Sequence, residues 1–183
     1  MHLSIWMDAQ NDFALKEENM IIEVIPVEES QKSVLRQLME LYNHDFSEYT
    51  KEDVNEHGLF GYSYLDYYWT QERRHPFFIK VDGCFAGFVL VGTGRRYSNN
   101  EKANSIAEFF VMRKYRGMNV GSFAAKHVFD LFNGEWEVRV LNANKPALSF
   151  WKKVITEYTN GSCIFHPEPT PDWDGVGYVF LSQ

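Results

Sequence analysis

The stretch EFFVMRKYRGMNVGS, residues 108–122, contains the residue types that could hold a phosphate. It starts as an apolar run, passes through a basic segment that ends at Arg116, and turns through Gly117 and Gly121 into a helical pattern. The first turn of a helix leaves backbone N–H groups without intrahelical acceptors, and these groups can donate to phosphate oxygens. This stretch is therefore our candidate for a phosphate-bearing cofactor site.

Other motifs that would carry chemistry are absent or incomplete. The six histidines follow no spacing that is typical of metal ligands, so we expect no metal. Gly92-Thr93-Gly94 lacks the third glycine of a dinucleotide-binding fingerprint and leads into a loop. The sequence contains neither the G-K-[ST] of a P-loop nor a G-x-S-x-G nucleophile turn.

Composition limits the class of protein. With 183 residues, of which 45% are hydrophobic, the chain can bury one sizeable core. The net charge of −7 argues against a nucleic-acid partner, because that class carries basic patches. Two scattered cysteines favour a reducing, cytoplasmic location over a disulfide framework. No apolar run approaches the roughly 18 residues of a membrane span, so we expect no membrane partner.

The N-terminal residues differ in character from the rest of the chain. Residues 1–19 are acidic and lack the basic start and apolar centre of a signal peptide. We expect them to form an appendage, either disordered or an extra helix, ahead of a single domain at 20–183. We do not expect the function to reside in them.

Hydrophobic periodicity predicts an α/β domain in which strands and helices are interspersed along the chain. Apolar runs predict strands at 21–27, 77–81, 84–91, 105–111, 136–141, 163–165 and 176–181. Asp82-Gly83 favours a two-residue hairpin turn, and Pro26 favours an edge position for the first strand. Ser30 and Asn144 are candidate helix N-caps.

Three helices are expected. The first presents an apolar face from Val34 to Tyr42, and the last extends from Asn144 to about Val154. The helix after the glycine turn ends before Gly134 and should bury Phe123, Ala124, Val128, Phe129 and Phe132. Residues 44–72 are rich in acids and aromatic rings without a regular period, and such a segment can form the wall of a binding pocket.

Two spaced motifs resemble the GNAT superfamily of acyl-CoA-dependent N-acyltransferases. The family's pyrophosphate motif, Q/R-x-x-G-x-G/A, is matched by Arg116 and Gly121, while Asn119 replaces the middle glycine. Asparagine adopts the left-handed backbone conformation more readily than most residues. The replacement therefore weakens the motif without removing it, and it could crowd the pyrophosphate.

The second motif, N-x-x-A-x-x-F-Y, is matched in register by Asn144, Ala147 and Phe150. Trp151 stands where many relatives have a tyrosine that protonates the departing thiolate, and an indole N–H cannot usefully supply a proton. Water or another tyrosine would then act as the acid, with Tyr158 as a weak candidate, or the step needs no acid.

The resemblance implies a three-layer α+β arrangement, with helices flanking a central mixed, mostly antiparallel twisted sheet, and acetyl-CoA or another short acyl-CoA as co-substrate. We expect neither a metal nor a covalent enzyme intermediate, because neither cysteine lies in the motif region. The resemblance also implies that Asn144 lies beside the pantetheine arm. The implied coenzyme A-binding residues are Phe110, Val111, Arg116, Gly117, Met118, Asn119, Val120, Gly121, Ser122, Asn144, Ala147, Phe150 and Trp151.

Glu108 is the candidate general base or holder of a water molecule. An alternating strand would place it on one face with Ile106 and Phe110, where apolar surroundings raise the pKa of a carboxyl group. Alternatively, its carboxylate pairs with Arg113 or Arg116 near the end of the strand. A backbone N–H of this strand is the expected donor to the oxyanion.

Asp45, Glu48 and Tyr49 lie where relatives hold their acceptor substrate. Carboxylates attract a cationic amine, and an aromatic ring can support one. The alternative is a solvated acidic face above an ordinary aromatic core. Both interpretations are open at the level of the sequence.

The sequence thus favours an enzyme that transfers an acetyl or short acyl group from acyl-CoA directly to a primary amine, with a small cationic amine as the expected acceptor. One alternative is a catalytically silent module of the same fold that binds acyl-CoA or a partner protein. Another is acetylation of a protein N-terminus or lysine. A homodimer is compatible with each of these functions.

Overall fold

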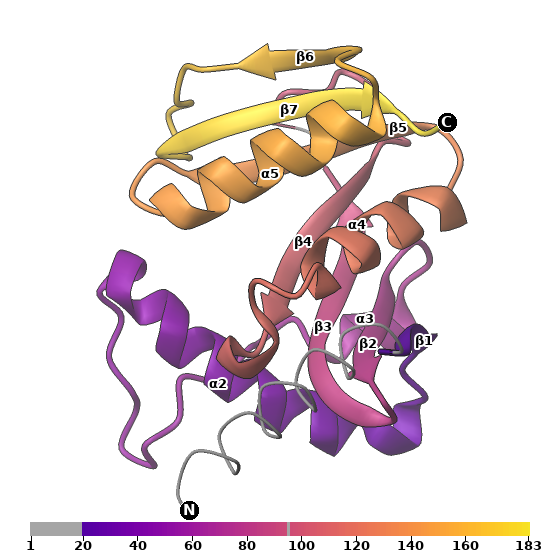
Figure 1. Cartoon of the computed structure of the whole chain (residues 1–183). Helices are drawn as coiled ribbons and strands as arrows, with labels where there is room; N and C mark the ends of the chain where they lie inside the picture. Colours follow the sequence, from indigo (N-terminus) through magenta and orange to yellow (C-terminus); the bar gives the residue numbers. More distant parts are fainter. Residues whose placement is uncertain (1–19, 95) are drawn as a thin grey trace, which may run out of the picture.

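The computed structural model describes residues 20–94 and 96–183, so the expected appendage at 1–19 lies outside the described residues. Its strands are β1 (Ile22–Pro26), β2 (His75–Val81), β3 (Cys84–Thr93), β4 (Asn104–Val111), β5 (Glu135–Leu141), β6 (Cys163–His166) and β7 (Gly175–Leu181). Its helices are α2 (Lys32–Thr50), α3 (Tyr67–Thr70), α4 (Val120–Leu131) and α5 (Lys145–Tyr158), with 3-10 turns η1 (Glu29–Gln31) and η2 (Arg113–Tyr115) (Figure 1).

The strands form one sheet in the order β1-β2-β3-β4-β5-β7-β6. Each neighbouring pair is antiparallel except β4 and β5. The predicted mixed, mostly antiparallel sheet is therefore confirmed. β1 lies at an edge, as expected for a strand that ends in Pro26, because proline cannot donate a hydrogen bond to a neighbouring strand.

Strands β4 and β5 pair over only part of their length. Residues 104–106 pair with 136–138, and the parallel register stops there. The remainders of the two strands, 107–111 and 139–141, therefore line a split in the sheet. Residues from 107–111 line both cavities of the candidate site, whereas 139–141 line only the smaller one.

A β-bulge in β4 coincides with this split. Leu90 pairs with Glu108, but the next residue of β3, Val91, pairs with Ile106, which leaves Ala107 as an extra residue. A bulge interrupts the alternation of faces along a strand. Ile106 accordingly packs in the core that α4 and α5 cover, whereas Glu108 contacts α2. The prediction that these two residues share a face is wrong for this reason.

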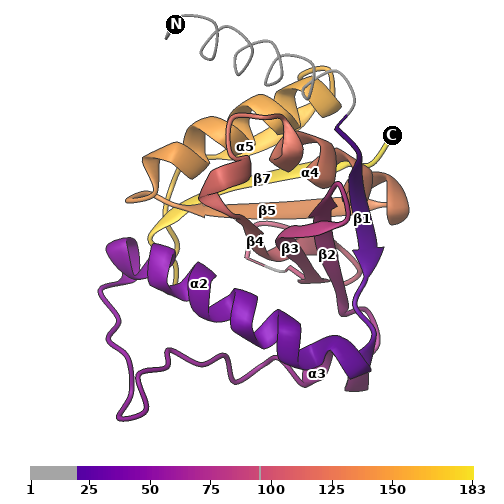
Figure 2. The ribbon, with the colours of Figure 1, turned by 60° about the horizontal axis from the view of Figure 1, so that its bottom comes forward.

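Helices cover both faces of the sheet, with α4 and α5 on one side and α2 on the other (Figure 2). The core beneath α4 and α5 contains Phe129, Trp136 and Trp151. The core beneath α2 and α3 contains Leu35 and Phe88. The expected three-layer arrangement is confirmed.

The hairpin turn agrees with its prediction from the local sequence, whereas the first helix differs from its prediction at both ends. Asp82 and Gly83 both have positive φ, 50° and 76°, which confirms the two-residue turn. Ser30 lies inside η1 and does not cap α2, whose N-cap is Gln31 without a side-chain hydrogen bond. α2 also continues well beyond Tyr42 to Thr50, so the first residues of the supposedly irregular segment are helical.

The two later helices begin where the sequence predicts. Asn144 caps α5, because its Oδ1 accepts a hydrogen bond from the Ala147 N–H at 3.1 Å. α5 continues to Tyr158, one turn beyond the expected end. In α4 the prediction that Phe123 is buried is wrong, since its residue surface is 43% exposed. Among the described residues, no helix has the length and apolarity needed to cross a membrane.

Candidate active site

The N-terminus of α4 is an uncapped helix start. Asn119, the N-cap residue, has φ 59° in the left-handed region, and its side chain caps no N–H. The Phe123 N–H donates to the Asn119 carbonyl at 3.0 Å. The N–H groups of Val120, Gly121 and Ser122 precede this bond and have no acceptor within the helix. An anion is the natural partner for such a group of N–H donors.

Gly121 allows two elements of this site to approach each other. A Cβ atom on Gly121 would lie 3.2 Å from Cε2 and 3.3 Å from Cζ of Phe150, closer than side chains normally pack. The start of α4 and the first turns of α5 therefore lie side by side. The two sequence motifs, which are about twenty residues apart, meet at this contact.

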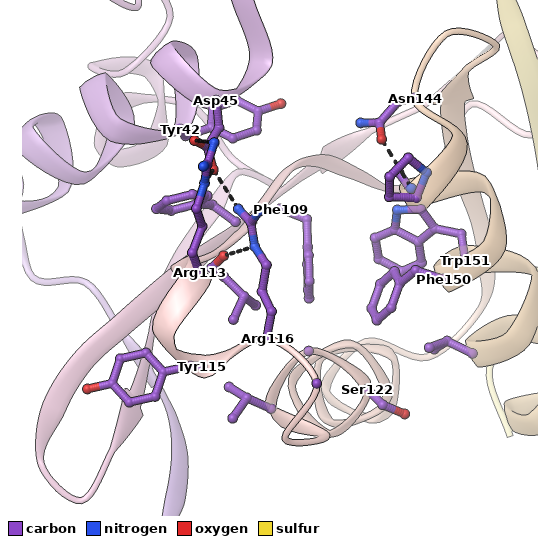
Figure 3. Close-up of a pocket in the computed structure, with 18 of the residues that line it drawn as sticks. Tyr42, Asp45, Phe109, Arg113, Tyr115, Arg116, Ser122, Asn144, Phe150 and Trp151 are labelled. Carbon is purple, nitrogen blue, oxygen red and sulfur yellow. Dashed lines mark hydrogen bonds and ion pairs between the residues drawn. The ribbon is translucent and has the colours of Figure 1, made fainter. Parts of the chain in front are cut away.

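A cavity of about 530 Å³ opens at this junction (Figure 3). Of the expected coenzyme A-binding residues, all except Met118 line it; Met118 packs against the core instead. Figure 3 shows Phe109 between the arginines on one side and the Trp151 and Phe150 rings on the other. The lining residues from the sequence motifs are Phe110, Val111, Arg116, Gly117, Asn119, Val120, Gly121, Ser122, Asn144, Ala147, Phe150 and Trp151.

Two arginines near the phosphate-binding turn converge on α2. Arg113 Nη2 and Arg116 Nη2 lie 2.8 Å and 2.6 Å from the carboxylate oxygens of Asp45, and Arg116 Nε donates to the Val111 carbonyl at 2.8 Å. Burial alone would raise the pKa of Asp45, but hydrogen bonds from the two arginines outweigh burial and hold the pKa below its ordinary value. Asp45 therefore remains a carboxylate whose charge is already matched.

This arrangement changes the expected acceptor site. Asp45, Glu48 and Tyr49 do line the large cavity, as the sequence predicts. However, Asp45 lies between two guanidinium groups, which would repel a cationic amine. The side chain instead ties α2 to the segment that precedes α4. The carboxylate of Glu48 is the remaining acidic group of this predicted trio.

Glu108 lies on the α2 side of the sheet, in a second cavity of about 230 Å³. Its Oε2 accepts a hydrogen bond from the Tyr42 hydroxyl at 2.6 Å. The alternative pairing with Arg113 or Arg116 is wrong, because both arginines pair with Asp45. The Tyr42 and Phe110 rings are in contact at 5.9 Å, so the predicted apolar surroundings of this carboxyl group are present.

Burial raises the pKa of Glu108 above its ordinary value, while hydrogen bonding by Tyr42 and Tyr62 opposes this increase. Burial also raises the pKa of the Tyr42 hydroxyl, and the neighbouring Glu108 carboxylate adds to the increase. A carboxylate with a raised pKa in a cavity can accept a proton from a bound substrate near neutral pH.

The two cavities share walls. The residues common to both are Tyr42, Phe46, Phe109, Asn144, Ala147 and Trp151. A molecule held at the N-terminus of α4 could therefore reach toward the cavity that contains Glu108. The split between β4 and β5 provides this route.

Tyr158 does not belong to the site. Its hydroxyl donates to Asp130 Oδ1 at 2.8 Å and accepts from the Gln183 N–H at 3.2 Å, and it lines neither cavity. The candidate acid is two turns beyond Trp151, about 10 Å further along α5, because a helix rises 1.5 Å per residue. Tyr158 is therefore withdrawn as the acid.

Sequence reasoning missed Tyr42, Phe109 and Arg139 as residues of the site. Tyr42 was assigned only to the apolar face of its helix, although a polar tip on such a face can mark a buried acceptor. Arg139 and Glu137 are the charged residues of the predicted strand at 136–141, and these charges were the available signal. The bulge that places Glu108 opposite Tyr42 has no local signature in the sequence.

Among the described residues, no group of three histidine, cysteine, aspartate or glutamate side chains is arranged to hold a metal ion. A comparison of the sequence with curated proteins found no match. The profile of the Acetyltransferase (GNAT) family does match, over residues 35–155.

Solved structures share the fold at low sequence identity. An acetyltransferase from Thermus thermophilus has a TM-score of 0.65 at 14% identity, over 87% of this chain and 96% of that chain. Spermidine N-acetyltransferase from Vibrio cholerae, in complex with CoA and spermine, has a TM-score of 0.61 at 9% identity, over 88% and 95%.

A further structural relative is the ribosomal-protein-S18-alanine N-acetyltransferase from Escherichia coli. It has a TM-score of 0.53 at 14% identity and covers 89% of this chain and 96% of that chain. The family profile spans most of the described chain and includes both motifs that meet at the cavity. The chain therefore belongs to the GNAT family of acetyltransferases.

Proposed function

We propose that this protein is an N-acetyltransferase that transfers an acetyl or short acyl group from acyl-CoA directly to a primary amine. The observation that carries the proposal is the junction of two cavities. One contains the uncapped N-terminus of α4, and the other contains the buried carboxyl group of Glu108. Phosphate recognition and proton abstraction would therefore occur in one connected space.

The larger cavity suits coenzyme A in three ways. The free N–H groups at Val120–Ser122 can donate to the pyrophosphate, and the two arginines that share the Asp45 carboxylate leave a net positive charge in the same cavity. Phe109, Phe150 and Trp151 provide an apolar wall for the pantetheine arm. Asn144 uses its carbonyl oxygen to cap α5, which leaves its amide N–H groups available to that arm.

The chemistry needs a base for the amine. The attacking nitrogen must lose a proton as the new C–N bond forms and the C–S bond breaks, and we assign this proton to Glu108. The thiolate of coenzyme A takes up a proton after it leaves. Because simple thiols have a pKa near 8.5, the thiolate is a good leaving group, and we propose that solvent rather than Trp151 protonates it.

The acceptor is the less constrained part of the proposal. Structural relatives include a spermidine acetyltransferase and an acetyltransferase of a ribosomal protein alanine. Both acceptor classes, a small amine and a protein N-terminus, are therefore compatible with this fold. The sequence leaves two alternatives open, a silent module and a protein acetyltransferase. Measurements of acetyl-CoA binding and of thiol release distinguish each of them from an acetyltransferase of small amines.

Ligand-dependent stability tests acetyl-CoA binding directly. Acetyl-CoA at a concentration 100 times its Kd should stabilise the folded protein by about 2.7 kcal/mol, which raises the melting temperature. Arg116→Gln should reduce the increase, because it removes one of the two positive charges that share the Asp45 carboxylate in this cavity. If millimolar acetyl-CoA leaves the melting temperature of the unaltered protein unchanged, the proposal is wrong.

Thiol release then separates an enzyme from a silent module. The protein is incubated with acetyl-CoA and a panel of amino acids, polyamines, aminoglycosides and peptides, and free coenzyme A is measured. We expect amine-dependent release with at least one class. Binding of acetyl-CoA without release above background would support the silent module, whereas release only with peptides would support a protein acceptor.

A further inference from the structure

The smaller cavity contains one charged side chain that the proposed acetyl transfer does not use, Arg139 of β5. Its guanidinium group lines the same cavity as the Glu108 carboxyl group. The two side chains come from the strands that part from each other beyond residues 106 and 138. They influence each other electrostatically across the cavity.

Arg139 is held in position on two sides. Its Nε lies 3.4 Å from Oε1 of Glu137, and its guanidinium carbon lies 5.2 Å from the centre of the Trp173 ring. Burial lowers the pKa of Arg139, and the Glu137 carboxylate opposes this effect. An arginine remains charged in either case. The positive charge is therefore fixed at the wall of the cavity.

The hydrogen-bonding capacity of this guanidinium is unused. The buried Nε makes no hydrogen bond despite its proximity to Glu137, and the guanidinium donates none to any residue within 20–94 and 96–183. Its side chain is 24% exposed, and it lines the cavity. A buried N–H group without an acceptor is costly, and a bound anion that accepts a hydrogen bond from it would remove that cost.

Pairing with Glu137 does not account for Arg139. The Glu137 carboxylate already accepts hydrogen bonds from the backbone N–H groups of Tyr97 at 2.8 Å, Ser98 at 2.9 Å and Arg96 at 3.3 Å. These three donors anchor the loop between β3 and β4 and stabilise the carboxylate charge. A further cation is not required to satisfy Glu137.

The cavity offers two opposite charges, and Tyr42 and Asn144 add uncharged polar groups to a lining that is otherwise apolar or aromatic. Among its lining residues, only Glu108 and Arg139 are acidic or basic. Its volume of about 230 Å³ equals that of about eight water molecules, at about 30 Å³ each. A molecule of that size with an amine and a carboxylate matches both charges. A polyamine would place a positive charge against Arg139.

We propose that the acceptor is a small amino acid whose carboxylate binds Arg139 while its amine lies at Glu108. This inference rests on the proposed acetyl transfer and names its acceptor class. A guanidinium recognises a carboxylate through paired N–H donors, so it selects the carboxylate over a neutral carboxamide. Arg139 could instead bind a carboxylate on the acyl group of the acyl-CoA, and the experiment distinguishes these two sources of the carboxylate.

The test compares acceptors that differ only in this group. Thiol release from acetyl-CoA is measured with alanine against alaninamide and with β-alanine against β-alaninamide, and spermidine serves as the cationic arm. We expect kcat/KM to be at least about tenfold higher for the carboxylate in one pair. A difference in the concentration of neutral amine cannot produce this preference. A carboxamide lowers the pKa of the amine relative to a carboxylate, so the carboxamide acceptor has the larger neutral fraction.

Substitutions of Arg139 then test whether this residue causes the preference for a carboxylate over a carboxamide. In Arg139→Gln the carboxylate-to-carboxamide ratio should fall to about one, whereas Arg139→Lys should keep part of it. The control is Arg74→Gln, which removes an arginine that stacks on Tyr67 and Tyr68 outside both cavities and should leave the ratio unchanged. If Arg139→Gln fails to fold, the unaltered protein and Arg139→Lys decide the result.

The outcomes separate this inference from the proposed function. Equal or better transfer to the carboxamides or to spermidine overturns the amino-acid acceptor and leaves acetyl transfer intact. A preference for succinyl-CoA over acetyl-CoA with a neutral amine, lost in Arg139→Gln, moves the carboxylate to the acyl group and also overturns it.

A binding measurement tests the carboxylate site if the protein acetylates no acceptor. The melting temperature of the protein saturated with coenzyme A is recorded with millimolar alanine and with alaninamide. If no acceptor releases thiol but alanine still raises the melting temperature in an Arg139-dependent manner, the carboxylate site is supported and acetyl transfer is wrong. If alanine is neither bound nor acetylated, the inference is wrong.

Discussion

The two ends of the site are built in different ways. The proposed coenzyme A end uses contiguous sequence: a turn at residues 116–119 sets the start of α4, and the backbone itself would supply the donors. The proposed acceptor end combines Tyr42 from α2, Glu108 from β4 and Arg139 from β5, which are far apart in the sequence. A ligand that is bound by backbone N–H groups can still bind after many side-chain substitutions. A ligand that is bound by particular side chains loses those contacts when the side chains change.

This difference explains why Asn119 and Trp151 depart from the family motifs without dismantling the cofactor end. Asn119 reaches the left-handed conformation that the motif glycine would provide, with φ 59°. Trp151 retains the apolar wall, although it provides no acid. At the acceptor end, by contrast, each charge comes from one side chain. Substitutions at the two ends should therefore differ in the size and kind of their effects.

Replacing the proposed base should have the largest effect. Glu108→Gln keeps the shape and the ability to accept from Tyr42, but it cannot take a proton from the amine. We expect kcat/KM for amine acetylation to fall by about 10²–10⁴-fold, while acetyl-CoA binding is nearly unchanged. An unchanged rate and pH profile would remove Glu108 as the base.

The pH profile provides the control for this variant. Burial raises the pKa of Glu108, and the Tyr42 hydrogen bond opposes that increase. Tyr42→Phe removes the opposing contribution, so the pKa should increase further. Because the base acts when deprotonated, the acidic limb of kcat/KM should then move to higher pH. A limb that stays in place or moves to lower pH would contradict this assignment.

The cofactor end should be sensitive to backbone access. In Gly121→Val the new side chain meets the Phe150 ring and enters the cavity, because even a Cβ would lie 3.2 Å from Cε2. If overpacking of about 1–3 kcal/mol opposes binding in full, acetyl-CoA binding becomes weaker by about fivefold to 150-fold. Gly121→Ala should have a smaller effect in the same titration.

Gly92 provides the matched control for this comparison. A Cβ on Gly92 would lie 3.8 Å from the Ala107 Cβ, which is ordinary contact, so Gly92→Ala should bind acetyl-CoA as the unaltered protein does. Equal affinity of the Gly121→Val variant and the unaltered protein would show that the approach of α4 to α5 does not matter for binding.

Removal of the Asp45 ion pairs, which join α2 to the segment before α4, should have the smallest effect. Asp45→Asn removes the carboxylate that joins α2 to Arg113 and Arg116, and it should lower the free energy of unfolding at neutral pH by up to about 1 kcal/mol. Burial raises the pKa of Asp45, but the arginines lower it further, to a net value below its ordinary 3.8.

The sign of the pH dependence comes from this net decrease. A carboxyl group whose folded-state pKa is depressed contributes stability above its unfolded pKa and loses that contribution as pH falls through the folded value. The unaltered protein should therefore lose more stability than Asp45→Asn when acidified below about pH 4 in chemical denaturation. Asp53→Asn, at an exposed acid, is the control and should match the unaltered curve.

Local patterns predicted many of the elements but not their exact lengths. Asp82-Gly83 specified its hairpin, and Asn144 specified the start of α5, because turn and cap preferences act within a few residues. α2 extended past its predicted break because Tyr42, Phe46 and Tyr49 continue one helical face, with ring contacts at 5.2 Å and 6.1 Å. Aromatic packing made up for the weak apolar period.

The sequence by itself determined the cofactor end: the strand, the turn with its left-handed Asn119, the uncapped helix and the capped α5 are all set by neighbouring residues. Only the tertiary structure decided the acceptor end. The bulge at Ala107 placed Glu108 beneath α2, two arginines neutralised Asp45, and the parting of β4 and β5 exposed Arg139 to the same cavity. Such pairings depend on how distant strands and helices pack, which no local preference specifies.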